Sequence, residues 1–264
     1  SNNVSTTIYL NVYTVNIKST SDWKDMLETV DDKNARFYLS TDLDFSGEDY
    51  ELRNGYDEEW HCHYIMGEFD GGFHKVSNIT MTNASENQSI FGYATAFTAK
   101  NVEFNSITFT STSANGGLFT SLMHHITEDG TNNIYTTLVQ DVICDFKYSS
   151  IGGSGIANAF YGGGIQIVFI SMKDANNNPL LPSKTWALTK ETYLWWDPNF
   201  VSNMICYVPQ GDVSITPKTA SSGLPMSYDA IYKTSSLIEA DFLASEYFDA
   251  NIWDIKPNEI PTFK

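Results

Sequence analysis

Alternating apolar and polar positions mark a strand near the start of the β-type region of the chain. In the segment "ARFYLSTDLDFSG", Phe37, Leu39, Leu43 and Phe45 are apolar, and Ser or Asp stands between several of them. This alternation predicts a half-buried β-strand, because successive strand side chains point to opposite faces. From here to Asp174, β-type runs and glycine turns follow one another without a clear helical pattern. The body of the chain is therefore predicted to be all-β.

One helix is predicted upstream of this body. In "STSDWKDMLETVDD", the apolar residues Trp23, Met26, Leu27 and Val30 recur at the offsets of one helical face, with Ser21 as the candidate N-cap. The helix is short, so a direct role in function is not expected. We expect it to cover the open end of a stack of strands that would otherwise expose its core.

A repeated pattern runs through the β region. Four runs compare well: "FHKVSNITMTN", "TAKNVEFNSITFTS", "LVQDVICDFKYSS" and "GIQIVFISMKD". Their aliphatic markers Ile79, Val102, Val142 and Val168 stand 23, 40 and 26 residues apart. The widest interval is expected to hold an insertion, for which "HHITEDGTNNIY" is the candidate. Directly before the markers stand Asn78, Asn101, Asp141 and Ile167.

A second recurring element lies between these runs: "SIFGYATAF", "GGLFTSLMHH" and "GGSGIANAFYGGG". Glycine beside an aliphatic and an aromatic residue suits a tight corner followed by an inward-pointing strand. Two alternating strand types indicate a coiled sheet, in which each rung buries its apolar face only by stacking on its neighbours.

These runs resemble the GLUG-type repeat family, which includes the region before the protease part of some bacterial immunoglobulin-A-cleaving metallopeptidases. The family pattern has a strand ending in Asp-Ile-Asp, a Phe-Asp-Gly-Asn-Gly-His turn, an Ile-x-Asn-aliphatic strand and a Gly-Leu-Phe-Gly corner. Here, Gly72 and Phe73 replace Asn-Gly in the turn, and the later corners are degenerate. The resemblance covers about residues 37–171 and the tail "NIWDIKPNEIPTFK", and the matching positions are residues 42–44, 69–74, 76–79 and 90–92.

The resemblance implies a single-stranded right-handed parallel β-helix, of the pectin-lyase-like solenoid type, with a short N-terminal capping helix. We expect one domain with three parts: residues 1–36 hold a strand and the capping helix, 37–174 the repeats, and 175–264 decorated final rungs with a closing segment. Gly71 and Gly72 would permit the turn, and Phe73 would reach inward. The structural repeat positions are Phe69, Asp70, Gly71, Gly72, Phe73, Asn78, Phe91 and Gly92.

Composition narrows the classes of partner. The chain of 264 residues is 42% hydrophobic and 18% charged, as in globular proteins, and its formal charge is -17. This charge repels phosphate backbones and anionic lipid surfaces, so nucleic acid is not an expected partner. Membrane insertion is not expected either, because no apolar run approaches the ~20 residues of a spanning helix. The acidic balance fits an exported or particle-bound protein, although solvated acidic loops would also explain it.

Cysteine and histidine offer little reactive chemistry. The cysteines are far apart and lack CxxC spacing, so Cys62, Cys144 and Cys206 are expected to be buried thiols. On a strand, His61 and His63 would share a face and could hold a metal with a facing carboxylate. No third ligand has a recognisable spacing, and the adjacent His124 and His125 would point to opposite faces. Neither a metal nor a cofactor is expected.

Two acidic residues and one aromatic segment are candidates for chemistry. Asp42 and Asp44 would share a strand face, and a glycoside hydrolase needs such paired carboxylates. The same Asp-x-Asp has a structural place in the repeat family, and Glu68 and Asp70 beside glycine are expected to form turns. The segment "TYLWWDPNF" could stack on sugar rings or pack in the core, and its candidate ligand-binding residues are Tyr193, Trp195, Trp196 and Asp197.

We expect a non-enzymatic β-helix for recognition or structure at a surface. It would be an adhesin-like segment of a bacterial envelope protein, or a fibre or spike component of a bacteriophage virion. Its partner would be a host or cell-surface glycan or protein, its location extracellular, and a phage-derived chain would form a homotrimer. The alternative is a glycan-degrading enzyme, a polysaccharide lyase or glycoside hydrolase, with a carboxylate-lined groove.

Overall fold

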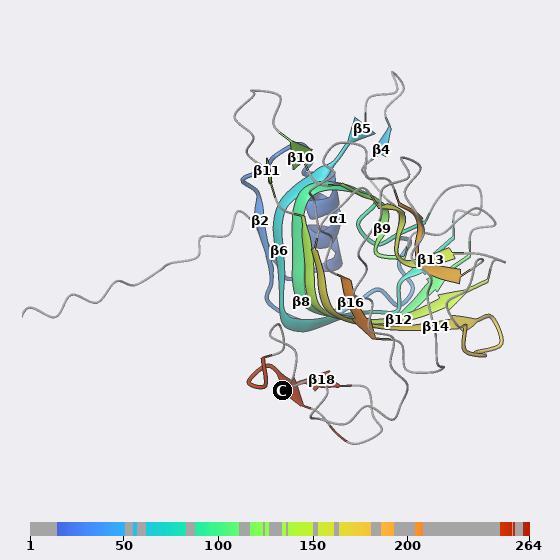
Figure 1. Cartoon of the computed structure of the whole chain (residues 1–264). Helices are drawn as coiled ribbons and strands as arrows, with labels where there is room; N and C mark the ends of the chain where they lie inside the picture. The colour runs from blue at the N-terminus through green and yellow to red at the C-terminus, as the bar shows by residue number, and fades with distance from the viewer. Residues whose placement is uncertain are drawn as a thin grey trace, which may run out of the picture.

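The computed structural model describes residues 15–50, 55–56, 62–82, 88–110, 117–123, 125–126, 134–135, 137–149, 153–160, 164–180, 186–192, 204–207, 249–254, 256 and 261–264. Within these residues, the chain is mostly β-strand and has one helix, α1 (Thr20–Glu28) (Figure 1). The all-β prediction for the body is confirmed. That helix, of nine residues, is too short to cross a bilayer, and the described residues hold no other.

The strands build one long sheet and three small ones. A 12-stranded sheet has the central path β1-β2-β6-β8-β12-β14-β16, in which every neighbouring pair is parallel. The strands are β1 (Val15–Ile17), β2 (Arg36–Leu39), β3 (Leu43–Asp44), β4 (Gly55–Tyr56), β5 (Cys62–His63), β6 (Ile65–Ser77), β7 (Thr80–Met81), β8 (Tyr93–Phe109), β9 (Phe119–Met123), β10 (His125–Ile126), β11 (Ile134–Tyr135), β12 (Leu138–Tyr148), β13 (Gly153–Phe160), β14 (Gly164–Asp174), β15 (Trp186–Thr192), β16 (Met204–Tyr207), β17 (Trp253–Asp254) and β18 (Thr262–Phe263).

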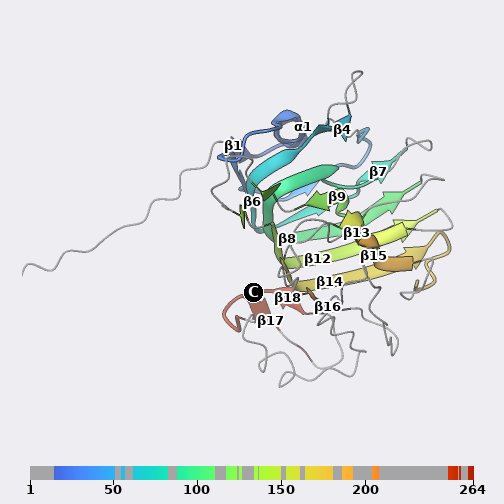
Figure 2. The ribbon, with the colours of Figure 1, turned by 45° about the horizontal axis from the view of Figure 1, so that its top comes forward.

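Two rows of strands alternate along the chain. The first residues of β8 pair with β9, β9 pairs with β13, and β13 pairs with β15, all in parallel. The chain thus alternates between this row and the row of β8, β12, β14 and β16, whose strands lie one above another in Figure 2. The predicted alternation of two strand types is confirmed, and the glycine-containing runs lead into β8, β9 and β13.

The register confirms three of the four repeat markers. Val102, Val142 and Val168 lie side by side on β8, β12 and β14. The alignment of Ile79 with Val102 is wrong, because His74 is the residue that pairs with Val102. Extra residues in β6 shift the register between positions 70 and 74. Because position 80 of β7 pairs with position 108 of β8, Ile79 lies beside a later part of β8 than Val102.

The long strands bend at residues with left-handed backbone. Asn101 and Asp141 occupy equivalent places on β8 and β12, with φ of 56° and 52°. A second bend lies at Asn78 and Ser106, with φ of 60° and 58°. Asn and Asp tolerate this region better than most residues, since their short side chains bond locally. The polar residues directly before the markers Ile79, Val102 and Val142 are therefore bend positions. Figure 1 shows the curved strands that result.

At the first bend of β6, the side chain of Phe73 points outward. It is 45% exposed, and its ring lies 5.2 Å from that of Phe263. The prediction that Phe73 reaches into the core is therefore wrong. Gly72 and Phe73 both have positive φ, of 57° and 63°, and this pair of left-handed residues turns the side chain away from the core.

The other repeat positions behave as corner and core residues. Phe69 and Phe91 are fully buried, and Phe91 stacks on Phe119 with ring centroids 5.3 Å apart. Gly92 adopts φ of 68°, and its backbone N–H donates to the buried Ser89 hydroxyl oxygen at 3.0 Å. A glycine at this corner avoids the strain that a side chain would meet there.

Helix α1 begins two residues earlier than predicted. Ser19, not Ser21, is the N-cap: its backbone is extended, and its hydroxyl accepts the Asp22 N–H at 3.2 Å. Trp23 is fully buried, as are Met26 and Leu27. Val30 lies beyond the last helical residue, Glu28.

Trp23 connects the helix to the core of the sheet. Its ring lies 5.4 Å from Phe69, 5.7 Å from Phe91 and 6.2 Å from Phe104. Its indole N–H donates to the buried hydroxyl of Tyr50 at 3.1 Å, and burial raises the pKa of Tyr50. The helix lies against the first strands of the sheet, as expected of a covering element (Figure 1).

Candidate functional site

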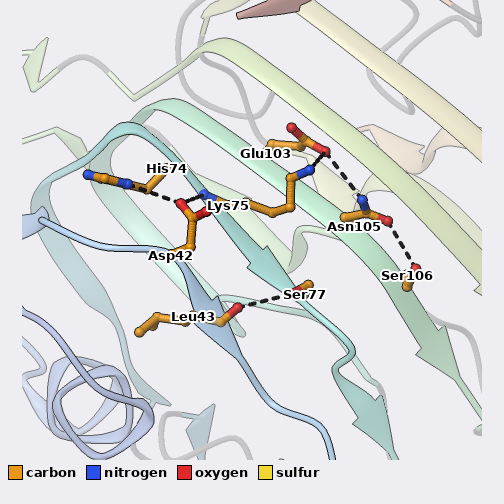
Figure 3. Close-up of polar contacts among 8 residues, drawn as sticks. All are labelled: Asp42, Leu43, His74, Lys75, Ser77, Glu103, Asn105 and Ser106. Atoms are coloured by element: carbon orange, nitrogen blue, oxygen red, sulfur yellow. Dashed lines mark hydrogen bonds and ion pairs between the residues drawn. The ribbon is translucent and has the colours of Figure 1, made fainter.

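A chain of polar side chains crosses the outer surface from β3 to β8 (Figure 3). The Lys75 ammonium of β6 lies 2.9 Å from a Glu103 carboxylate oxygen of β8. Asn105 donates to Glu103 at 3.4 Å, and the Ser106 hydroxyl donates to Asn105 at 2.9 Å. We call the residues Asp42, His74, Lys75, Glu103, Asn105 and Ser106 the outer polar network.

Asp42 ends this network beside strand β3. One of its carboxylate oxygens accepts the backbone N–H of Lys75 at 3.0 Å and lies 3.0 Å from Nδ1 of His74. Because a carboxylate only accepts, Nδ1 carries the hydrogen, and Nε2 is left as the acceptor of the neutral ring. The Lys75 N–H bond, followed by the His74 bond, lowers the pKa of Asp42 below its ordinary value.

Asp44 has a separate set of partners. Its Oδ1 accepts the backbone N–H of Ser46 at 2.9 Å, the Ser46 hydroxyl at 2.7 Å and the Asn78 amide at 2.9 Å. The Ser46 hydroxyl, then Asn78, lower the pKa of Asp44. This residue therefore closes a turn and fastens it to the second bend of β6.

Neither Asp42 nor Asp44 has the raised pKa that a general acid in glycoside hydrolysis requires. A general acid keeps its proton at the working pH because its pKa is raised. Asp42 and Asp44 both have lowered pKa values, and both carboxylates are bound by backbone N–H groups and side chains of this chain. These hydrogen bonds connect each aspartate to a neighbouring turn or bend.

A second histidine–aspartate pair repeats the arrangement of the first. His63 Nδ1 lies 2.9 Å from Asp31 Oδ2, and the Tyr64 N–H donates to Asp31 Oδ1 at 3.2 Å. His63 and His74 thus bind different carboxylates. In the described part of the chain, no group of three or more His, Cys, Asp or Glu side chains is placed to hold a metal ion.

A ladder of ion pairs follows the outer face across β2, β6 and β8. Glu68 lies 2.9 Å from the Arg36 guanidinium and 2.6 Å from the Lys100 ammonium. Glu68 is therefore a strand residue and not the turn former that we predicted. Asp70 does form the turn, because it accepts the Gly72 N–H at 3.0 Å, and it also accepts the Asn101 amide at 3.0 Å.

Several predicted site residues lie outside the described residues. These include the whole aromatic segment Tyr193, Trp195, Trp196 and Asp197, together with His61 and His124. His125 is described only as backbone, in β10. Among the cysteines, Cys144 is a buried thiol as predicted, and the side chains of Cys62 and Cys206 are outside the description.

One buried polar contact was not predicted. Asp141, which is 3% exposed, accepts the indole N–H of Trp253 at 3.0 Å. The two residues are 112 positions apart. Asp141 stood out in the sequence as a polar residue before an aliphatic marker, but nothing local pointed to Trp253 as its partner.

Comparison with protein-family models, with curated proteins and with solved structures finds no match to this chain. The functional argument therefore rests on the described geometry and on the sequence pattern.

Proposed function

We propose that the chain is a right-handed parallel β-helix that serves recognition or structure at a surface without catalysis. It would be an adhesin-like segment of a bacterial envelope protein, or a fibre or spike component of a bacteriophage virion. Its location would be extracellular, at a cell surface or on the virion.

Two observations support the β-helix. Parallel strands of two rows alternate along the chain, which a coiled sheet requires. Bends at equivalent positions of neighbouring strands, such as Asn101 and Asp141, would repeat the corner of the coil. The right hand follows from the general rule that crossover connections between parallel strands of one sheet are right-handed in about 98% of cases. A relation to GLUG-type repeats is part of this proposal.

The observation that carries the recognition function is the way outer polar side chains bind their neighbours on adjacent strands. Asp42 binds β6, Glu68 bridges β2 and β8, and Asp70 binds β8. Such cross-strand bonds hold polar groups in a fixed array, and a rigid array loses little conformational entropy when a partner binds. The same bonds occupy the carboxylates that hydrolysis would need.

The proposed partner is a host or cell-surface glycan or protein. Residues 193–197 are the proposed sugar platform, because Trp and Tyr rings stack on the C–H face of a sugar while Asp197 accepts from hydroxyl groups.

The test is binding of the purified full chain to a glycan array and to whole bacterial cells. We expect the variant Trp195→Ala/Trp196→Ala to lose at least about tenfold in affinity, roughly 1.4 kcal/mol. Lys24→Ala, which removes a surface charge on helix α1 away from this array, is the control and should bind as the original chain does. Unchanged binding by the double tryptophan variant would remove the proposed platform.

A second measurement separates recognition from catalysis. The chain is incubated with capsular and cell-wall glycans, and release of reducing ends or of unsaturated products is followed. We expect no turnover. Turnover that disappears in Asp42→Asn or Asp44→Asn would replace the recognition function by glycan degradation.

A further inference from the structure

The C-terminal segment folds back onto the bend of the sheet. Strands β17 and β18 pair in antiparallel fashion, Trp253 with Phe263 and Asp254 with Thr262, as a two-stranded sheet separate from the long parallel one. Figures 1 and 2 show this C-terminal hairpin beside the parallel strands. We use that name for residues 249–264 as far as they are described.

Aromatic rings attach the C-terminal hairpin to the sheet. The Trp253 ring lies 5.0 Å from Phe169 of β14 and 4.7 Å from Phe263. Phe263 in turn meets Phe73, the outward-pointing residue of β6, at 5.2 Å. Trp253 is only 2% exposed, so the contact buries most of a large apolar side chain.

The polar centre of this contact is the carboxyl group of Asp141. It lies at the bend of β12 and accepts the Trp253 indole N–H. A buried carboxylate is costly unless it is paired with a cation or well supplied with hydrogen bonds. The carboxylic acid avoids this cost and still offers its carbonyl oxygen to the indole.

We propose that the contact between Asp141 and Trp253 is a pH-responsive latch, which holds the C-terminal hairpin against the sheet more tightly as the pH falls. The latch is independent of the proposed recognition function, because it involves neither residues 193–197 nor the outer polar network.

The groups around Asp141 also favour tighter docking of the hairpin at low pH. Asp249, from the hairpin segment, brings a second negative charge towards it, and Gln140, on its own strand, supplies a hydrogen bond. On β8 the equivalent residue is Asn101, which is neutral and donates to Asp70, and Asp70 is paired with Lys100. On β14 the flanking pairs Gln140–Gln166 and Val142–Val168 place position 167 beside Asp141. Among these neighbours, no cation faces the carboxyl group.

The sign of the effect follows from proton linkage. Burial, the largest cause, raises the pKa of Asp141 above 3.8 in the docked state, although the Trp253 bond opposes the rise. With the hairpin undocked, the carboxyl group is hydrated and its pKa returns towards that value. Between the two pKa values only the docked state holds the proton, so docking weakens as the pH rises through this window and is strongest below it. Each pKa unit between the states changes the docking equilibrium by up to about tenfold.

Hydrogen–deuterium exchange of the full chain tests the latch. Exchange of peptides from residues 249–264 is measured between pH 4.5 and 7.5 and corrected for the intrinsic pH dependence of exchange. We expect protection to fall as the pH rises, because an undocked two-stranded hairpin is only marginally stable. Protection that stays constant, or that increases with pH, would overturn the proposal.

Variants identify the group that responds. Asp141→Asn should keep the hairpin protected at every pH, since Asn retains the acceptor oxygen and adopts the same backbone at position 101. Trp253→Phe keeps an aromatic ring but loses the donor, and should lower protection at every pH by roughly two- to tenfold. Asp254→Asn, on the same hairpin beside Lys256, is the matched control and should respond to pH as the original chain does. A pH response that persists in Asp141→Asn would assign it to another group and reject the latch.

Discussion

The backbone at the first bend of β6 is set by individual residues. Gly71 has no space for a side chain: a Cβ atom there would lie 2.5 Å from the Asn101 carbonyl oxygen and 2.5 Å from the Val102 Cβ. Gly72 and Phe73 then turn the chain through left-handed conformations. Asn101 achieves the bend of β8 with a single residue, because its short polar side chain tolerates that region.

A side chain at Gly71 should therefore cost more than one at a glycine in open space. We expect Gly71→Ala to lower the free energy of unfolding by about 3 kcal/mol, because backbone and Cβ atoms of β8 must move. Gly47→Ala is the control: its Cβ would meet nothing within 4 Å, and only its φ of 78° is strained, at about 1 kcal/mol. Urea denaturation measures both, and a larger loss for Gly47→Ala would contradict the steric argument.

Among the elements, helix α1 has Trp23 as its largest buried side chain. Trp23 contacts aromatic rings from β6, from the corner before β8 and from β8 itself, so it joins parts of the sheet as well as covering them. The neighbouring residue Lys24 has its ammonium paired with Glu48 at 3.3 Å on the surface. Surface pairs of this kind contribute little to stability.

Truncation of the two neighbouring residues should separate these contributions. We expect Trp23→Ala to cost about 3–5 kcal/mol, because it leaves a large cavity and removes the donor to the buried Tyr50 hydroxyl. Lys24→Ala should change stability by no more than about 0.5 kcal/mol. Thermal and urea unfolding give both values. Equal effects would mean that the helix is held by its surface pairs.

At the scale of the whole molecule, the carboxyl groups change the pH dependence of folding stability in two opposite directions. Hydrogen bonds from Lys75 and His74 lower the pKa of Asp42, and hydrogen bonds from Asn178 lower that of Asp174. These two carboxylates favour the folded state above the unfolded value of 3.8, and the benefit is lost as the pH falls through their folded pKa values. Asp141 has the opposite sign, because burial raises its pKa.

The melting temperature should consequently fall when the pH is lowered below 3.8, because among the described residues more carboxylates have lowered than raised pKa values. Circular dichroism melts between pH 7 and pH 2 measure this. Asp42→Asn should melt lower than the original chain at pH 7, and the difference should shrink in acid, where Asp42 is protonated in both states. A melting temperature that rises below pH 3.8 would show that burial of Asp141 outweighs the other groups.

Much of this architecture could be predicted because it depends on local physical chemistry. Strand alternation follows from the two-residue period of side chains, and the helical face follows from the offsets of Trp23, Met26 and Leu27. The two strand types were visible because each carries its own glycine or polar bend residue. Asn101 and Asp141 bend their strands for reasons that lie within the residue itself.

Three features depended on contacts between residues far apart in sequence. The register of β6 on β8 could not be predicted, because the extra residues of its first bend are accommodated only against β8. Phe73, which its left-handed backbone turns outward, finds its aromatic partner Phe263 in the distant hairpin. The buried carboxyl group of Asp141 has its indole partner Trp253 at a distance of 112 positions in the sequence. The local pattern of residues thus specifies which segments form strands and where they bend. Packing between distant segments decides the strand register and the burial of side chains. It also decides the protonation of Asp141, the one buried carboxyl group among the described residues.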